Sequence, residues 1–588
     1  MTSNELRKKF LSFFVKKKHK IVPSSSLIPT DTSVLFTTAG MQQFKNYFLG
    51  EKSPHGNKIT SCQKCFRTSD IDEVGDKSHL TFLEMLGNFS FGDYFKEEAI
   101  KLAYKLLISN FQIPISKLWI TYFKGDAIVP EDKKSKEVWR KIKIPENRIF
   151  GFSKKDNFWG PTGIEGPCGP TTEIHLDLTG KPCQKGKNCI PNCECGRFIE
   201  LWNLVFNEYY QDKNQNLTLL KQKGVDTGMG LERLAVVCQL KNSVYETDLF
   251  EPIIKEIEKN TSKSYNLHLK AYRVIADHIK SSVFLISEGI FPSNVERGYI
   301  LRRIIRRAIR YKKLLDLPKN FLITLSQKVI EIYKNIYPEL LSNQADILTV
   351  VQKEEEKFEK TIEKGLIQFD KLLKSKTKEE KIIKGEEVFN LYQSYGFPLE
   401  LTEELAREKS LEIDKIGFDK AFEKHQEISR AGVQKKFGGL GKEATYESIK
   451  LHTATHLLHA ALRQILGSHV KQMGSDINPQ RLRFDFSHSQ KLTKDELKRT
   501  EDLVNKKIKE DLEIKKREMN LKDALKSGAL SFFKEKYPEI VTVYSIGDFS
   551  KEICAGPHVK KTSELGYFRI TKEESSGAGV RRIKAVLE

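Results

Sequence analysis

Long apolar runs and cysteine are the two scarce features of this sequence. No run of eighteen apolar residues occurs, which excludes the apolar helix that a membrane span requires. Residues 11–15 form an apolar stretch that is too short and too closely flanked by lysine for the core of a signal peptide. The 588 residues include nine cysteines, an odd number that favours metal-binding or core thiols over a disulfide framework. We therefore expect a cytoplasmic protein without membrane attachment.

Acidic residues are outnumbered by basic ones. The 99 lysines and arginines against 78 aspartates and glutamates give a formal charge of +21. Such an excess favours a polyanionic partner, most commonly a nucleic acid, although a generally lysine-rich proteome would give the same balance. With 39% hydrophobic residues the chain can build several domains with cores, which excludes a disordered protein.

Composition divides the chain into four segments. Residues 1–245 mix β-like runs with glycine-rich and aromatic-rich loops, and predict an α+β domain. Residues 246–430 have sparse glycine and apolar residues at helical spacing, which predicts a helical domain. Residues 431–445 have the composition of a linker, and residues 446–588 predict a second α+β domain.

Spacing and capping signals predict several local elements. Thr2 and Glu5 have the capping-box pattern before a helix that carries Phe10 and Phe14 on its apolar face. The other expected elements are extended segments at 34–38 and 198–206, a hairpin of strands 80–85 and 89–91, a strand at 482–486, and helices at 449–466 and 493–517.

Two clusters of residues have metal-ligand spacing. His452 and His456 lie one helical turn apart, and Cys554 and His558 flank a Gly-Pro turn, so the two pairs offer four ligands suited to tetrahedral zinc. A shell filled by protein donors is typical of structural zinc, so a functional role needs a ligand that can leave or a zinc that binds substrate. A second cluster packs four thiols into residues 183–195 and favours a zinc knuckle over four unrelated thiols. Its members are Cys183, Cys189, Cys193 and Cys195.

Two further patterns are suited to phosphate. The glycines of residues 227–230 follow Asp226 and precede Arg233 at the start of an expected helix, and Arg67 lies upstream of the aromatic hairpin. A cation, an acidic residue and an aromatic platform are what a nucleoside triphosphate with its metal requires. In residues 301–310, apolar residues form one face of a helix while arginines crowd the other, which fits either phosphate binding or a solvated basic face.

With these motifs in place, the sequence resembles the alanyl-tRNA synthetases, which are class II aminoacyl-tRNA synthetases. The resemblance covers essentially the whole chain and rests on many segments. They are residues 23–45, 81–95 and 224–233 for the three class II motifs, residues 156–159, 166–170, 202–205 and 293–303, and the two zinc-ligand pairs. It implies an α+β multidomain protein with an antiparallel β-sheet core flanked by helices, an all-helical tRNA-recognition domain and an α+β zinc-dependent editing domain.

The resemblance also implies the chemistry and the residues that perform it. Alanine would be activated with Mg²⁺ and ATP and then transferred to tRNA(Ala). The residues implied for ATP binding and catalysis are Arg67, Glu84, Met85, Phe89 and Arg233. Those implied for L-alanine binding are Trp159, Asn203, Val205, Asp226 and Gly228. Asn294, Arg302, Arg303 and Arg306 would contact the tRNA acceptor stem with its G·U pair.

A second site follows from the size of the substrate. One methylene or hydroxyl changes binding by only about 1–3 kcal/mol, so a pocket for alanine discriminates poorly against glycine and serine. By resemblance, His452, His456, Cys554 and His558 hold an editing Zn²⁺, with Thr455 and Gln472 lining the pocket that hydrolyses mischarged tRNA(Ala).

Several positions depart from the family pattern. Residues 68–72 lack the lysine-bearing loop of many relatives, Gln393 stands where an Asp is common, and Pro557 replaces a Thr. The interval from residue 398 to residue 452 is too short for the β-barrel that usually precedes the editing core. The sequence stops at Glu588 without the C-terminal dimerisation domain of many relatives, so we expect a monomer.

Three other interpretations remain open. A class II synthetase for threonine shares a similar His and Cys editing site, although the residues from Asp226 to Gly230 favour alanine. A non-catalytic tRNA-binding or regulatory protein would not need Arg67, Asp226 and Arg233. A stand-alone deacylase would leave the ATP-type domain without a purpose.

Overall fold

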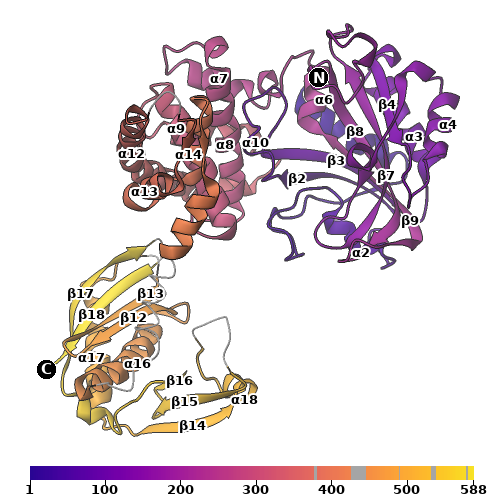
Figure 1. Cartoon of the computed structure of the whole chain (residues 1–588). Coiled ribbons are helices and arrows are strands. Elements are labelled where there is room, and N and C mark those ends of the chain that lie inside the picture. The colour runs from indigo at the N-terminus through magenta and orange to yellow at the C-terminus, as the bar shows by residue number, and fades with distance from the viewer. Residues whose placement is uncertain (377–379, 426–444, 489, 532–537, 578–579) are drawn as a thin grey trace. The chain divides into compact units, whose positions relative to one another are not determined.

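The computed structural model describes residues 1–376, 380–425, 445–488, 490–531, 538–577 and 580–588 (Figure 1). Its contacts form two units, Met1–Ser375 with Ser394–Leu401 and Lys376–Gln393 with Thr402–Glu588. The first unit holds the helices after residue 246 together with the preceding α+β segment, because aromatic contacts such as Phe82 on Phe284, 3.9 Å between ring centroids, join them. All but the last residue of the expected linker 431–445 lies outside the described residues.

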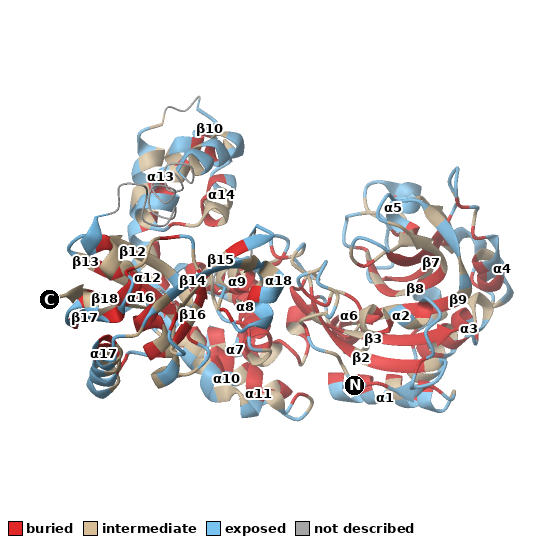
Figure 2. Ribbon diagram, turned by 90° about the horizontal axis from the view of Figure 1, so that it is seen from below, coloured by how far each residue is buried: buried red, intermediate tan, exposed pale blue. Residues whose placement is uncertain are grey.

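A mixed, largely antiparallel sheet forms the centre of the first unit. Neighbouring strands follow the order β1 (Lys20–Ile21), β2 (Lys58–Phe66), β3 (Phe82–Phe91), β9 (Leu217–Gly230), β8 (Phe198–Gln211), β7 (Gly166–Asp177), β4 (Leu118–Phe123) and β5 (Ile149–Phe152), with β6 (Phe158–Trp159) beside β7. The pairs β1–β2 and β4–β5 are parallel, and the other pairs are antiparallel. The expected antiparallel core is confirmed, and Figure 2 shows buried residues along β2, β3 and β8.

Short helices flank this sheet. They are α1 (Ser3–Val15), α2 (Lys45–Phe48), α3 (Lys96–Lys105), α4 (Lys133–Lys141), α5 (Lys154–Asn157) and α6 (Leu231–Cys238). The capping box of Thr2 and Glu5 is present at the start of α1, as predicted. Phe10 of α1 lies 5.7 Å from Trp202 of β8, between ring centroids, so the apolar face of the helix packs on the sheet.

Two local predictions in this unit were wrong. Residues 82–91 form the single strand β3 and not a hairpin. A Cβ on Gly87 would lie 2.8 Å from the Thr227 carbonyl oxygen and 2.6 Å from the Phe89 ring, so this glycine permits close packing and makes no turn. Residues 34–36 are bends and residues 37–38 are irregular, so this segment is not a strand.

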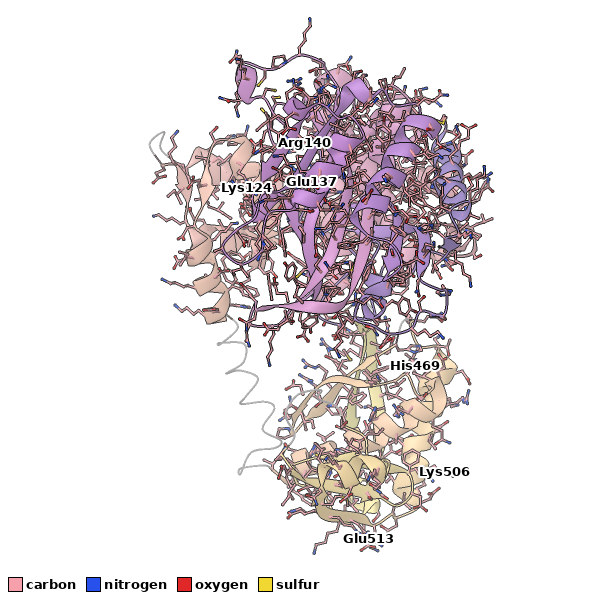
Figure 3. All side chains as sticks on the ribbon, turned by 90° about the vertical axis from the view of Figure 1, so that its right-hand side faces the viewer. Lys124, Glu137, Arg140, His469, Lys506 and Glu513 are labelled. Carbon is pink, nitrogen blue, oxygen red and sulfur yellow. The ribbon has the colours of Figure 1, made fainter. Side chains whose placement is uncertain are left out.

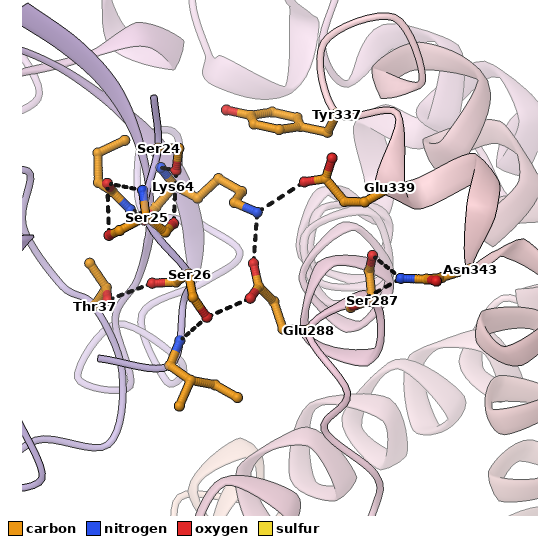
Figure 4. Close-up of polar contacts among 12 residues, drawn as sticks. Ser24, Ser25, Ser26, Thr37, Lys64, Ser287, Glu288, Tyr337, Glu339 and Asn343 are labelled. Carbon is orange, nitrogen blue, oxygen red and sulfur yellow. Dashed lines mark hydrogen bonds and ion pairs between the residues drawn. The ribbon is translucent and has the colours of Figure 1, made fainter. Parts of the chain in front are cut away.

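The helical part of the first unit begins with α7 (Glu251–Glu258). It continues with α8 (Leu269–Ser287), α9 (Glu296–Leu314), α10 (Phe321–Tyr333), α11 (Glu339–Ser342) and α12 (Gln344–Lys374). Figure 4 shows its junction with β2, where the Lys64 ammonium lies 2.6 Å from the Glu288 carboxylate and 3.1 Å from that of Glu339. Partly buried ion pairs of the buried Lys64 therefore join the helices to the sheet.

The second unit contains an α+β part built on two sheets. The four-stranded sheet has the order β12 (Gln472–Asn478), β13 (Arg481–Ser487), β18 (Val580–Leu587) and β17 (Phe568–Gly577), and its helices are α16 (Tyr446–Leu466) and α17 (Lys494–Lys509). The three-stranded sheet comprises β14 (Ile514–Asn520), β15 (Ile540–Ile546) and β16 (Ser550–Ile553), with α18 (Leu521–Lys526) beside β14 and β15. The helix expected over 493–517 was too long, because α17 ends at Lys509 and β14 begins at Ile514.

The remaining elements lie between these parts in the sequence. They are β10 (Ile382–Ile383), α13 (Gly385–Tyr395), α14 (Leu399–Glu408) and β11 (Glu412–Ile413). Charged side chains such as Glu137 and Arg140 on α4 and Lys506 on α17 project from the surface (Figure 3). Among the described residues, no helix has the length and apolar character of a membrane span.

Candidate active site and metal centres

A cavity of about 290 Å³ opens on one face of the large sheet. Its walls come from β3, β7, β8, β9, α6, the 67–81 loop and the segment around α5 and β6. Eight of the expected ATP and alanine residues line it. They are Arg67, Met85, Trp159, Asn203, Val205, Asp226, Gly228 and Arg233.

Strand alternation explains why these residues meet. Side chains at i and i+2 point to the same face of a sheet, and β8 and β9 pair Asn203 with Gly228 and Val205 with Asp226. A Cβ on Gly228 would lie 2.8 Å from the sulfur of Met85, so the glycine makes room for that side chain. Three adjacent strands thus present one small pocket.

Two expected ATP residues do not line the cavity. The Glu84 side chain points to the opposite face of β3 and is fully buried there. It accepts a 2.8 Å hydrogen bond from Arg7 Nε and another of 2.8 Å from the Tyr337 hydroxyl. The structure therefore does not bring Glu84 to the cavity, since strand alternation turns its side chain away from that of its neighbour Met85. Phe89 is also fully buried and packs on Phe44, 4.8 Å between ring centroids.

Two of the acids that line the cavity have different surroundings. Burial raises the pKa of Asp226 to about 7, because the carboxylate loses its hydration without gaining a charged partner. Arg233 Nη1 lies 3.2 Å from the Glu200 carboxylate. Burial alone would raise the pKa of Glu200, but the charge of Arg233 lowers it. Asp226 therefore titrates near pH 7, whereas Glu200 is ionised at that pH.

Sequence reasoning missed several lining residues. They are Asp70, Ser78, His79, Leu80, Glu173 and Glu200. A hydrogen bond with Asp76, 2.7 Å from His79 Nδ1, raises the pKa of His79 and favours its cationic form. The pairing of Glu173 with Asn203 could have indicated Glu173. Glu200 does not follow from the alternation of Asn203 and Val205, because β8 has an irregularity between Trp202 and Glu200. No local signal marks the loop residues.

The first metal cluster lies between α16 and the turn after β16. One ligand atom from each of His452, His456, Cys554 and His558 lies within 4.8 Å of the other three. Gly556 is required for this approach, since a Cβ there would lie 2.4 Å from the His452 ring. Burial alone would raise the pKa of the Cys554 thiol, but hydrogen bonds from the three imidazoles lower it to about 3.

The Nδ1 atoms of these histidines are held by other groups. His452 Nδ1 donates to the Pro557 carbonyl oxygen at 3.0 Å, and His558 Nδ1 lies 3.1 Å from the Thr453 hydroxyl. The Nε2 atoms are therefore directed to a common point. His558 Nε2 is buried without a hydrogen-bond partner, as a metal ligand would be before the ion is added. The donor set fits zinc.

Glu552 is a further residue that sequence reasoning missed. Its carboxylate lies 2.9 Å from Nδ1 of His456 and 2.9 Å from Nδ1 of His459, and all three residues are buried. A carboxylate behind a ligating imidazole fixes its tautomer and orientation. Its position two residues before the predicted ligand Cys554 was the feature of the sequence that could have indicated it.

The expected editing-pocket residues have local partners. The Thr455 hydroxyl donates to the Leu451 carbonyl oxygen at 2.9 Å, and the Gln472 amide donates to the Ser475 hydroxyl at 3.1 Å. Thr455 adjoins His456 on α16, and Gln472 begins β12.

The four cysteines of the second cluster also converge. Each offers a sulfur within 4.8 Å of the others. The Cys183 and Cys193 sulfurs are 3.8 Å apart, those of Cys189 and Cys195 are 3.7 Å apart, and none of the four is in a disulfide. Four thiols at these separations fit one zinc ion.

Comparisons with known proteins agree with this geometry. Residues 5–473 match the family described as tRNA synthetases class II (A), and residues 541–584 match the Threonyl and Alanyl tRNA synthetase second additional domain. The Alanine--tRNA ligase of Borrelia hermsii is 50% identical, with 100% of both chains covered. That of Treponema denticola is 48% identical, covering 100% of this chain and 99% of the other. For Thermotoga maritima the identity is 41%, with 100% and 80% covered.

The chain belongs to the alanyl-tRNA synthetase family. It is accordingly a ligase of class II, and its second family match fits a deacylase. The expected arginine face of this synthetase is not free of partners. Arg302 hydrogen-bonds Asn294, Arg303 Nη2 lies 2.8 Å from Asp72, and Arg306 Nε lies 2.7 Å from Glu354. A phosphate would have to compete with these groups.

Proposed function

We propose that this synthetase activates alanine with ATP, transfers it to tRNA(Ala) and hydrolyses Ser-tRNA(Ala) and Gly-tRNA(Ala) at a separate zinc site. The observation that carries the proposal is the cavity in which buried Asp226 lies together with Arg67 and Arg233. It joins a site for a small ammonium-bearing substrate to cations suited to a triphosphate.

Alanine recognition is assigned to the wall formed by β6, β8 and β9. Asp226, assisted by Asn203, accepts the ammonium group. Trp159, Val205 and Gly228 bound the methyl group. Because Gly228 is already close to Met85, little room remains for a larger side chain.

Activation is assigned to the cationic part of the cavity. Arg67 and Arg233 bind the phosphates of ATP, and Met85 contacts the adenine. An alanine carboxylate oxygen attacks the α-phosphorus and pyrophosphate leaves. The 3′-terminal ribose hydroxyl of tRNA then attacks the adenylate carbonyl and AMP leaves. Both steps need orientation and charge neutralisation more than a protein nucleophile.

Mg²⁺ would accompany the ATP. Glu173 and Glu200 line the cavity and offer the carboxylate oxygens that this ion prefers. When bound, Mg²⁺ neutralises phosphate charge.

Editing is assigned to the histidine and cysteine cluster. His452, His456, Cys554 and His558 would hold Zn²⁺, which when bound supplies a Lewis acid for the aminoacyl ester. Thr455 and Gln472 would line the pocket that selects serine. The Cys183, Cys189, Cys193 and Cys195 cluster would hold a structural zinc.

Recognition of the acceptor stem is assigned to α9 and the turn before it. Asn294 would contact the G·U pair, while Arg302, Arg303 and Arg306 meet phosphates. A monomeric state remains a prediction that sedimentation velocity would check.

The proposal is tested by ATP–pyrophosphate exchange with alanine, serine, glycine and threonine, followed by charging of tRNA(Ala) with and without the G·U pair. We expect exchange to be strongest with alanine and charging to require the pair. Strongest exchange with threonine would assign another substrate. Absence of exchange with all four amino acids would refute the activation site.

A further inference from the structure

The loop of residues 67–81, between β2 and β3, supplies much of the proposed ATP side of the cavity. Arg67, Asp70, Ser78, His79 and Leu80 all line it. Between its two flanking strands the loop contains no helix or strand. Regular hydrogen bonding therefore does not fix its shape, and other contacts must do so.

Helix α8 holds the loop at two places. Arg273 Nη1 donates to the carbonyl oxygens of Gly75 at 3.2 Å and Asp76 at 2.8 Å. The Asp277 carboxylate accepts from the Thr81 backbone N–H at 2.9 Å and from the Thr81 hydroxyl at 2.6 Å. The middle and the end of the loop are thus bound to one helix.

Helix α9 holds the beginning of the loop. Arg307 donates to the Ile71 carbonyl oxygen and to His278 Nε2, which lies 3.0 Å away. Because arginine can only donate, His278 Nε2 accepts and its Nδ1–H donates to Asp277 at 2.8 Å. The hydrogen bonds form one chain from α9 through α8 to Thr81.

Burial makes these contacts strong constraints. Arg273 and Arg307 are 6% and 7% exposed, and Asp277 and His278 are 0% exposed. A buried charge without its partner is costly, so the loop cannot leave these groups without exposing or orphaning them. The packing of α8 and α9 therefore constrains the shape of the loop, which residues 243–245 also bind at the Lys77 and His79 carbonyl oxygens.

We propose that Arg273, Asp277 and Arg307 are positioning residues for ATP. They hold the loop in the shape that directs Arg67 and His79 into the cavity, so the helices assigned to tRNA recognition also set the affinity for ATP. The inference rests on the proposed function of the cavity. The alanine wall belongs to β6, β8 and β9, so loss of these contacts affects ATP and not alanine.

The test compares Arg273→Met with Arg273→Lys. The first removes both donors and keeps an apolar side chain, while the second keeps a cationic donor. Lys312→Met is the matched control, because Lys312 is a buried cation of α9 that pairs with Glu355 of α12. For each protein we would measure KM for ATP, KM for alanine and kcat in exchange without tRNA, together with Tm. The dissociation constant of ATP alone, from calorimetry, needs no reaction.

We expect Arg273→Met to raise the KM and dissociation constant of ATP by about tenfold or more, the size of a lost hydrogen bond to a charged group, and to leave KM for alanine unchanged. Arg273→Lys should recover most of the ATP affinity, and Lys312→Met should lower Tm alone. Unchanged ATP binding in Arg273→Met, or a parallel loss for ATP and alanine, would overturn the inference. Wild-type protein that binds ATP but shows no exchange would contradict the proposed function instead.

Discussion

The pH dependence of alanine binding gives a direct test of the role of Asp226. Burial raises the pKa of this carboxyl from 3.8 to about 7. The ammonium group of alanine pairs with the carboxylate form only, so binding must release the proton below neutral pH. With a pKa near 7, about a tenth of the carboxyl is ionised at pH 6 and about three quarters at pH 7.5, so the affinity for alanine should rise about eightfold between them.

The same shift predicts an opposite effect on folding. The folded state binds this proton more tightly than the unfolded chain, so the group favours the folded state at low pH. That stability is fully present below the unfolded pKa and is lost as pH rises from about 4 to about 7. The shift of about 3 pKa units corresponds to roughly 4 kcal/mol, an upper figure because the cavity can admit water.

Calorimetric titration with alanine from pH 5.5 to 8 would measure the first effect, with Asp226→Asn as the control. The variant should bind weakly at every pH and lose the pH dependence, because the amide is neutral and has no proton to release in this range. It should also unfold at higher urea concentration at pH 8, since it no longer buries a carboxylate. An affinity that is flat with pH in the wild type, or a slope that persists in Asp226→Asn, would refute the assignment.

Three further predictions concern the metal clusters. Glu552→Gln should weaken zinc binding by about 10–100-fold, because His456 loses its orienting carboxylate. Competition with a chelator measures the zinc affinity, with the exposed Glu513→Gln as control. Equal zinc affinities of Glu552→Gln and the wild type would show that Glu552 does not support the site. Cys183→Ser should lose one zinc equivalent and lower Tm; a variant unchanged in both would end the zinc-knuckle proposal. His452→Ala should charge alanine normally while Ser-tRNA(Ala) accumulates, and unchanged hydrolysis of Ser-tRNA(Ala) would contradict the editing assignment.

Short-range signals predicted much of this molecule. The capping box of Thr2 and Glu5 starts α1, and one helical turn brings His452 and His456 together, because both features depend on neighbours in sequence. Contacts between distant segments were not predictable in the same way. Gly87 was mistaken for a turn because the reason for it, the close approach of the Thr227 carbonyl, lies 140 residues further along the chain.

Strand β3 shows what the family resemblance could predict and what only the structure could reveal. Resemblance placed Glu84 and Met85 together in one ATP-binding motif, yet adjacent residues of a strand face opposite sides of the sheet. Met85 lines the cavity, whereas Glu84 joins Arg7 of α1 to Tyr337 of the helical part. The motif therefore lines the cavity proposed for the substrates on one face and packs against the helical part on the other. The 67–81 loop likewise has two sets of contacts, because some of its side chains line the cavity while its backbone is bound by α8 and α9.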